Sequence, residues 1–147
     1  MIQENITKKN LFFVKIIIVV LICAGLCSCS ESHNDTDIWK DAVYTADTEL
    51  GSGKKTLEVQ VVALDNSITF TIHSDKKTVG EALTEHKLIE GERGSYGIYV
   101  KKVNGITADY DTDKTYWAFT KNGESMMTGV DGAEFKDGEH YELVYTK

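Results

Sequence analysis

An apolar run near the N-terminus determines how much of the chain is available to fold. The run extends from Ile16 to Leu26, and Lys8, Lys9 and Lys15 precede it. A basic segment followed by about 7 to 15 apolar residues is typical of a secretory signal peptide. A membrane-spanning helix needs about 20 apolar residues, a length that this run reaches only if Lys15 is included. Residues 1–28 are therefore predicted to be a signal peptide.

The residues before Cys29 match a bacterial lipobox. Leu26 lies three positions before this cysteine, and the small Ser28 lies directly before it. Cys27 fits less well, because Leu26 would then occupy the position that requires a small side chain. A lipobox thiol takes a diacylglyceryl group, and two acyl chains hold a protein on a membrane where one would release it. We expect a lipoprotein anchored through Cys29 to the extracytoplasmic face of the cell membrane; the alternative is a signal peptide whose cysteines carry no lipid.

The mature chain offers no free thiol and little attraction for nucleic acid. Cys23 and Cys27 lie in the predicted signal peptide, and the lipid occupies Cys29, so disulfides and thiol catalysis are excluded. After residue 28 the chain has 13 basic and 22 acidic residues, a net charge of −9. A nucleic-acid partner is therefore not expected.

Composition divides the mature chain into two parts. Residues 29–55 are polar and acidic, which predicts a tether, although Trp39 and Tyr44 could fold back onto the domain. Gly51-Ser52-Gly53 marks the expected boundary. Residues 56–147 are predicted to form one small domain.

Hydrophobic periodicity predicts an α+β fold of the β-grasp (ubiquitin-like) type, with a mostly antiparallel or mixed sheet. Residues 56–64 and 68–72 alternate between apolar and polar positions, which indicates a β-hairpin. Residues 78–81 form a capping box, and apolar residues at helical spacing follow it. Asn-Gly and Asp-Gly turns at 104–105, 122–123 and 137–138 separate further strands, expected at 96–103, 116–120 and 141–145.

Candidate catalytic and metal-binding residues are few. The four histidines lack the close spacing of an HxH or HxxxH site, and the sequence predicts neither an enzyme nor a histidine metal site. The four are His33 in the tether, His73 and His140 on predicted strands, and His86 near the end of the predicted helix. The two on strands are expected on outward faces.

The segment Asp109–Asp113 copies the first ligands of a calcium loop. Lys114 then replaces the turn glycine and Thr120 replaces the final glutamate, so the EF-hand pattern fails at both positions. A weak calcium site and a solvated acidic turn are the two interpretations of this loop.

Aromatic residues gather between residues 96 and 119, and two methionines follow closely. Because side chains alternate across a strand, Tyr116 points away from the face that Trp117 and Phe119 share, so the whole cluster cannot be core. An exposed aromatic and thioether patch suits a large, flat, partly apolar ligand. The alternative is that these residues fill the core and its edges. The candidate residues are Tyr96, Tyr99, Tyr116, Trp117, Met126 and Met127.

Short motifs in this region resemble the transcobalamin-like C-terminal domain family, of the DUF4430 type. The resemblance covers about residues 57–147. Its motifs are TVGEAL at 78–83, YGIYV at 96–100, VNGI at 103–106, YWAF at 116–119, NGE at 122–124, MTGV at 127–130 and DGE at 137–139. Their order and spacing, rather than any single motif, make the resemblance specific.

The resemblance implies a cobalamin or corrinoid ligand and requires no further cofactor. In the animal carriers, cobalamin lies between this domain and a large helical barrel, and the segments that match 99–105 and 126–129 lie near the corrin. By resemblance, Tyr99, Trp117 and the methionines would contact the ring, while Thr128 and backbone amides would bond the corrin side-chain amides. The sequence has no counterpart of the barrel, so an uptake transporter or a second binding protein is expected to supply the other face.

Two other functions stay open on the sequence alone. A structural or adhesion module at the cell surface would pair its sheet edge with another protein. A weak calcium or other metal binder would use residues 109–113. The α+β fold itself does not choose among the three, since one fold carries many functions.

Replacing Cys29 with serine is expected to leave an unprocessed, unlipidated precursor, because this thiol accepts the diacylglyceryl group. Cells fed radioactive palmitate should label the wild-type protein and a Cys27→Ser control, but not the Cys29→Ser protein, which should also be retained less by the membrane. Label on the Cys29→Ser protein would show that the anchor is assigned to the wrong residue.

Overall fold

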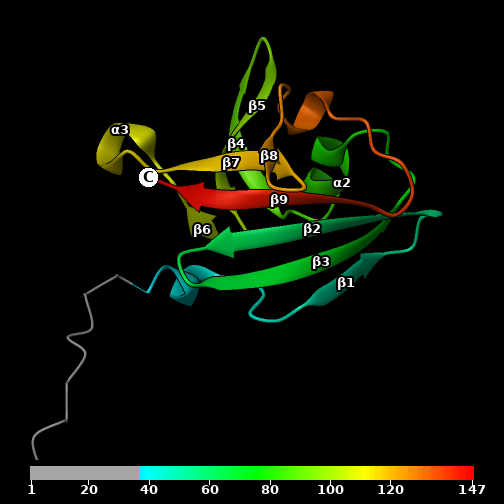
Figure 1. Cartoon of the computed structure of the whole chain (residues 1–147), viewed down its shortest axis with the longest axis horizontal. Helices are drawn as coiled ribbons and strands as arrows, with labels where there is room; N and C mark the ends of the chain where they lie inside the picture. The colour runs from blue at the N-terminus through cyan, green and yellow to red at the C-terminus, as the bar shows by residue number, and fades with distance from the viewer. Residues whose placement is uncertain (1–36) are drawn as a thin grey trace, which may run out of the picture. The chain divides into compact units, whose positions relative to one another are not determined.

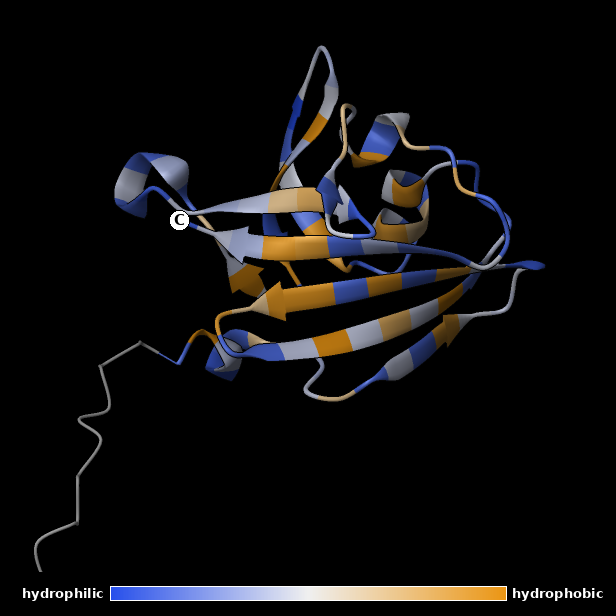
Figure 2. Cartoon of the chain, viewed as in Figure 1, coloured by the Kyte–Doolittle hydropathy of each residue, from blue (hydrophilic) through white to orange (hydrophobic). Residues whose placement is uncertain are grey.

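A long antiparallel hairpin forms the centre of the fold in the computed structural model, which describes residues 37–147 (Figure 1). It consists of β2 (Lys55–Ala63) and β3 (Asn66–Ser74), as the alternation predicts. Figure 2 shows hydrophobic and hydrophilic residues alternating along both strands. The apolar positions are buried because they face the core: Leu57, Val59, Val61, Ile68, Phe70 and Ile72.

The hairpin belongs to a six-stranded mixed sheet whose two central strands are β2 and β9. Strand β9 (Glu139–Thr146) runs parallel to β2 and antiparallel to β7 (Tyr116–Lys121). The strand order is β1-β3-β2-β9-β7-β8, with β1 (Thr48–Gly51) and β8 (Glu124–Ser125) at the two edges. The last strand of the chain therefore joins the first hairpin to the later strands.

Helix α2 (Val79–Glu85) begins at the predicted capping box. The Thr78 hydroxyl accepts a hydrogen bond from the Glu81 backbone N–H at 3.2 Å, and the Glu81 carboxylate accepts one from the Thr78 N–H at 3.1 Å. These bonds satisfy backbone donors that the first helical turn leaves free. Val79, Ala82 and Leu83 are buried in the same core as the sheet residues, which confirms an α+β organisation.

A second, three-stranded antiparallel sheet contains β4 (Ile89–Gly94), β5 (Gly97–Val103) and β6 (Ile106–Thr107). Strand β4 was not predicted, because only its first residue is buried and it shows no alternation. The remaining elements are short: η2 (Ile38–Asp41), α3 (Tyr110–Asp113) and η3 (Val130–Gly132). Within residues 37–147, no helix has the length and apolar character needed to cross a bilayer.

The folded part begins earlier than residue 56, so the predicted tether is corrected for residues 37–55. Trp39 donates its indole N–H to the Ala63 carbonyl at 2.9 Å, and Tyr44 packs edge-on against Phe70 with ring centroids 5.4 Å apart. Strand β1 then pairs in parallel with β3. Burial of these scattered apolar side chains outweighs the polar composition of the segment. The signal peptide, Cys29 and His33 lie outside the described residues.

Asn104 fastens this N-terminal segment to the second sheet. Its side chain donates to the Tyr44 carbonyl at 2.8 Å and accepts from the Tyr44 N–H at 2.9 Å, and its carbonyl accepts from the Val43 N–H at 2.9 Å. Asn104 also adopts the left-handed conformation (φ 50°) of the predicted Asn-Gly turn. Asn104 is only 1% exposed, and both the oxygen and the nitrogen of its side-chain amide have hydrogen-bond partners.

Substitution of Asn104 tests this attachment. Asn104→Ala is expected to lower the free energy of unfolding by about 1 to 3 kcal/mol more than Asn122→Ala, because it leaves two part-buried backbone groups of Tyr44 unpaired. Asn122 is a matched control, since it also has positive φ (54°) in an Asn-Gly turn but makes no bond to Tyr44. Urea denaturation provides the comparison, and equal losses would contradict the assigned role.

Candidate ligand-binding surface

An open cleft of about 490 Å³ lies where β7 turns through β8 toward η3. Three of the seven predicted ligand-binding residues line it: Met126, Met127 and Thr128. Met126 is partly buried against the core, whereas Met127 is 99% exposed. The predicted Asn122-Gly123 turn, with both residues at positive φ, reverses the chain at one side of the cleft. The loop thus presents one thioether that is anchored and one that is free.

The wall of the cleft includes Lys121, whose charge is compensated. Its Nζ lies 2.9 Å from Glu139 Oε1, and the Tyr141 hydroxyl donates to Glu139 Oε2 at 2.8 Å. The hydrogen bond from Lys121 is the main reason why the pKa of Glu139 falls from 4.5 to about 2. Burial raises the pKa of Tyr141, which stacks on Phe119 with ring centroids 5.4 Å apart. This network joins the cleft to the core.

Tyr96 and Tyr99 lie on the β4–β5 hairpin and not in the wall of the cleft. Tyr96 stands at the tip and is fully exposed, and Tyr99 is 51% exposed. The hairpin lies beside η3, the element that directly follows the Met126–Thr128 loop, as Figure 1 shows. The structure therefore brings these two predicted segments to neighbouring positions.

The structure places Tyr116 and Trp117 away from this cleft. Tyr116 is at the start of β7, opposite Thr146, while the cleft is at the other end of that strand; it packs against Tyr110 instead. Trp117 is 7% exposed and packs edge-on against Tyr145. The alternation along β7 directs Trp117 into the core, where its ring cannot meet a surface ligand.

In the acidic loop, the carboxylates of Asp109 and Asp113 accept hydrogen bonds from groups of the loop itself. Asp109 caps α3 by accepting from the backbone N–H groups of Asp111 at 3.0 Å and Thr112 at 3.4 Å, and these bonds lower its pKa. Asp113 accepts from the hydroxyl and backbone N–H of Thr115, which lowers its pKa in the same way. Within residues 37–147, no group of three histidine, cysteine, aspartate or glutamate side chains is placed to hold a metal ion.

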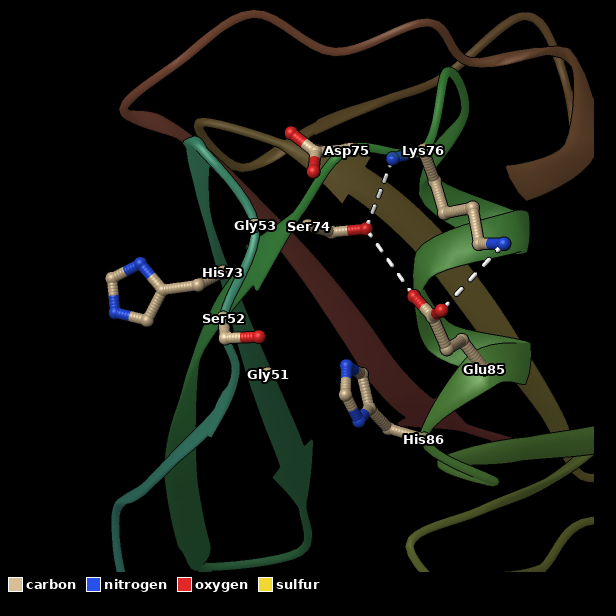
Figure 3. Close-up of a pocket in the computed structure, with 9 residues that line it drawn as sticks. All are labelled: Gly51, Ser52, Gly53, His73, Ser74, Asp75, Lys76, Glu85 and His86. Carbon is tan, nitrogen blue, oxygen red and sulfur yellow. Dashed lines mark hydrogen bonds and ion pairs between the residues drawn. The ribbon is translucent and has the colours of Figure 1, made fainter.

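A second cleft, of about 450 Å³, was not found from the sequence, because Gly51-Ser52-Gly53 was interpreted as a domain boundary. It lies between that connection, the end of β3 and the end of α2 (Figure 3). His86 points into it, whereas His73 points away and pairs with Glu49 at 2.7 Å. A matching histidine, His140, lies 3.5 Å from Glu58 on the sheet surface. Both strand histidines are half-buried and pair with carboxylates on the sheet surface, which fits their predicted outward faces.

These features define a small α+β domain with open surface clefts. Residues 76–147 match the family model described as Domain of unknown function (DUF4430). The chain belongs to this family, as the predicted DUF4430-type assignment states. No curated protein matches the chain significantly.

Two solved structures are similar to this chain. One is a protein from Ruminococcus gnavus ATCC 29149, described provisionally as metal-binding: it is 34% identical, with a TM-score of 0.61, over 64% of this chain and 98% of that one. The other is haptocorrin in complex with Cbi, 18% identical with a TM-score of 0.53, over 67% of this chain and 26% of that one. At this identity, the likeness to haptocorrin shows a shared fold.

The Lys121–Glu139 pair predicts a pH dependence of stability. Because the pKa of Glu139 is lower in the folded protein, its stabilising effect is present above pH 4.5 and is lost as the pH falls toward about 2. Glu139→Gln should therefore reduce the loss in the free energy of unfolding between neutral and acid pH. Glu124→Gln, in the same cleft, is the control. If wild type and Glu139→Gln lost stability equally on acidification, the proposed pairing would be wrong.

Proposed function

We propose that this protein is a membrane-anchored, extracytoplasmic lipoprotein that binds a corrinoid such as cobalamin and contributes to its uptake, without enzymatic activity. The single observation that carries the proposal is the exposed Met127 beside the half-buried Met126 in an open cleft. A large apolar side chain left in water at a cleft favours a partly apolar ligand. Family membership and the fold shared with haptocorrin, a protein solved in complex with Cbi, support it.

A β-grasp topology is part of this proposal. The hairpin β2–β3 is followed by helix α2, and β9 returns parallel to β2 at the centre of the sheet. The order β3-β2-β9-β7, with α2 packed in the same core, supports a β-grasp assignment. This topology leaves the loops around η3 and the β4–β5 hairpin free to form a ligand surface.

The chemistry of the surface suits a flat macrocycle with polar side chains. Met126 and Met127 offer polarisable thioethers to the ring face, and Thr128 offers a hydroxyl to amide groups at its rim. Tyr96 and Tyr99 would extend the contact along the hairpin. An open cleft covers only one side of such a ligand, so a transporter or a second binding protein would cover the other.

The position of the chain's attachment is compatible with this role. The described domain begins at Asp37, next to the turn between β2 and β3, where Trp39 bonds Ala63. Figure 1 places this start far from the tip of the β4–β5 hairpin. The first described residue therefore lies away from the candidate surface.

Metal binding is the second candidate function, because the Ruminococcus gnavus protein is described provisionally as metal-binding. The Asp109–Asp113 segment gathers three carboxylates, and a weak calcium site would have to form there. The capping bonds of Asp109 and Asp113 compete with any such ion. We therefore place this function after corrinoid binding.

Titration of the soluble chain from Ser30 with cobinamide, cobalamin and calcium tests the proposal. Truncating a ligand contact usually costs about 1 to 3 kcal/mol, so Met126→Ala or Met127→Ala should weaken cobinamide binding by roughly tenfold to a hundredfold. Tyr116→Ala is the control, since Tyr116 is an exposed aromatic at the other end of β7. Met127→Ala should keep the wild-type melting temperature, because Met127 buries almost nothing.

Three results would contradict the proposal. The first is a failure of the wild-type protein to bind cobinamide at about millimolar concentration, where even a weak complex with a free energy near −4 kcal/mol forms. The second is an equal loss of cobinamide affinity in Tyr116→Ala and Met127→Ala, which would show that the cleft is not the binding site. Sub-micromolar calcium binding would move metal binding to first place.

A further inference from the structure

The proposed corrinoid surface is assembled from two separate segments. Tyr96 and Tyr99 come from the β4–β5 hairpin, and Met126–Thr128 come from the loop before η3. Strand β4 is an edge strand whose residues after Ile89 are all exposed. The base of the hairpin is held by β6 and by core contacts of Ile98 and Val100, whereas the tip that carries Tyr96 is exposed. A ligand that touched both segments would have to order any part of this tip that other contacts left loose.

Asp131 connects the hairpin to the loop. Its Oδ2 accepts a hydrogen bond from the Ile98 backbone N–H at 3.0 Å and another from Arg93 Nη1 at 3.1 Å. Arg93 and Ile98 face each other in the register of β4 and β5. One carboxylate oxygen thus holds both strands just below the tip that carries Tyr96. The Asp131 side chain is only 22% exposed, whereas Arg93 is 65% exposed.

Asp131 itself is fixed against helix α2. A Cβ at Gly80, in the first turn of that helix, would lie 2.2 Å from Asp131 Oδ1 and 3.0 Å from its backbone nitrogen. The neighbouring Val130 is buried, and the Val79 N–H donates to the Ala133 carbonyl at 2.9 Å. Only a glycine at position 80 lets η3 approach the helix so closely.

A second glycine serves the hairpin side. Gly97 has φ +103°, and a Cβ there would lie 2.9 Å from Asp131 Cβ and 3.1 Å from Oδ2. A side chain at this position would be strained and would also displace the carboxylate. Gly80 and Gly97 thus leave room for Asp131 on its two sides.

We infer that Asp131 is a positioning residue that holds the β4–β5 hairpin at a set distance from the Met126–Thr128 loop. This inference rests on the proposed function for its ligand, because only a ligand large enough to touch both segments gains from their fixed spacing. A macrocycle of corrinoid size meets that requirement. The carboxylate does not contact the ligand; it keeps the hairpin ordered before binding, which lowers the entropy that binding has to remove.

Hydrogen exchange in the soluble chain, measured residue by residue, tests the positioning role without a ligand. Asp131→Ala should speed exchange of hairpin amides, Ile98 first, by roughly tenfold or more, while amides of β2 keep their wild-type protection. Asp131→Asn keeps an acceptor oxygen but loses the charge, so its hairpin amides should exchange at rates between those of the wild type and Asp131→Ala. Asp137→Ala is the matched control, since Asp137 also accepts a backbone N–H, that of Thr56 at 2.7 Å, but lies outside this surface.

Cobinamide affinity, measured on the same proteins, tests the link to the ligand. Asp131→Ala should weaken binding by roughly tenfold, and Asp137→Ala should not. Unchanged hairpin exchange in Asp131→Ala would overturn the inference whatever the ligand is. Fast hairpin exchange with unchanged cobinamide affinity would also overturn it, because the hairpin would then lie outside the ligand surface. If wild type bound no cobinamide but hairpin exchange rose as expected, the positioning role would stand and the proposed ligand would fall.

Discussion

The insertion of β9 between β2 and β7 is the contact on which the rest of the structure depends. It joins the N-terminal hairpin to the later strands and places Tyr141 and Leu143 in the core at 1% exposure. A buried tyrosine hydroxyl needs a partner, and Glu139 provides it two residues earlier on the same strand. Glu139 then pairs with Lys121 at the cleft. The hydrogen bond that the buried Tyr141 hydroxyl needs thus fixes the Glu139 carboxylate, and with it the ion pair to Lys121, at the cleft.

The candidate surface is shallow because the domain is small. A folded unit of this size encloses a thin core, and its ligand has to lie on the outside. Two segments, the Met126–Thr128 loop and the β4–β5 hairpin, project beside η3 and supply thioether and aromatic groups. Asp131 and the two glycines that surround it hold these segments together. The surface is ordered because η3 packs against α2, and not because it lies in a deep pocket.

Local signals in the sequence were sufficient for much of the fold. The capping box at Thr78, the alternation along β2 and β3, and the Asn-Gly turns each involve residues a few positions apart, and all form as predicted. Among the elements that the sequence did not predict, β1 and β4 were missed for different reasons. Strand β1 lies in a polar segment and is held by pairing with a distant strand, and β4 is too exposed to show alternation.

The candidate surface was predicted only in part. Alternation separated Tyr116 from Trp117, but it could not show that Trp117 is buried or that Tyr116 lies at the far end of its strand. The contacts of Asp131 with Arg93 and Ile98 join residues more than thirty positions apart, so no local pattern could indicate them. Such pairings depend on the completed fold and are visible only there.

Chemical-shift mapping of isotope-labelled protein with cobinamide is the direct test of the proposed ligand surface. We expect the largest shifts at Met126–Thr128 and at Tyr96 and Tyr99 on the hairpin, with little change at Tyr116 or in the second cleft, between Gly51 and His86. Shifts centred on the Gly51–His86 cleft, or no shifts at millimolar cobinamide, would contradict it.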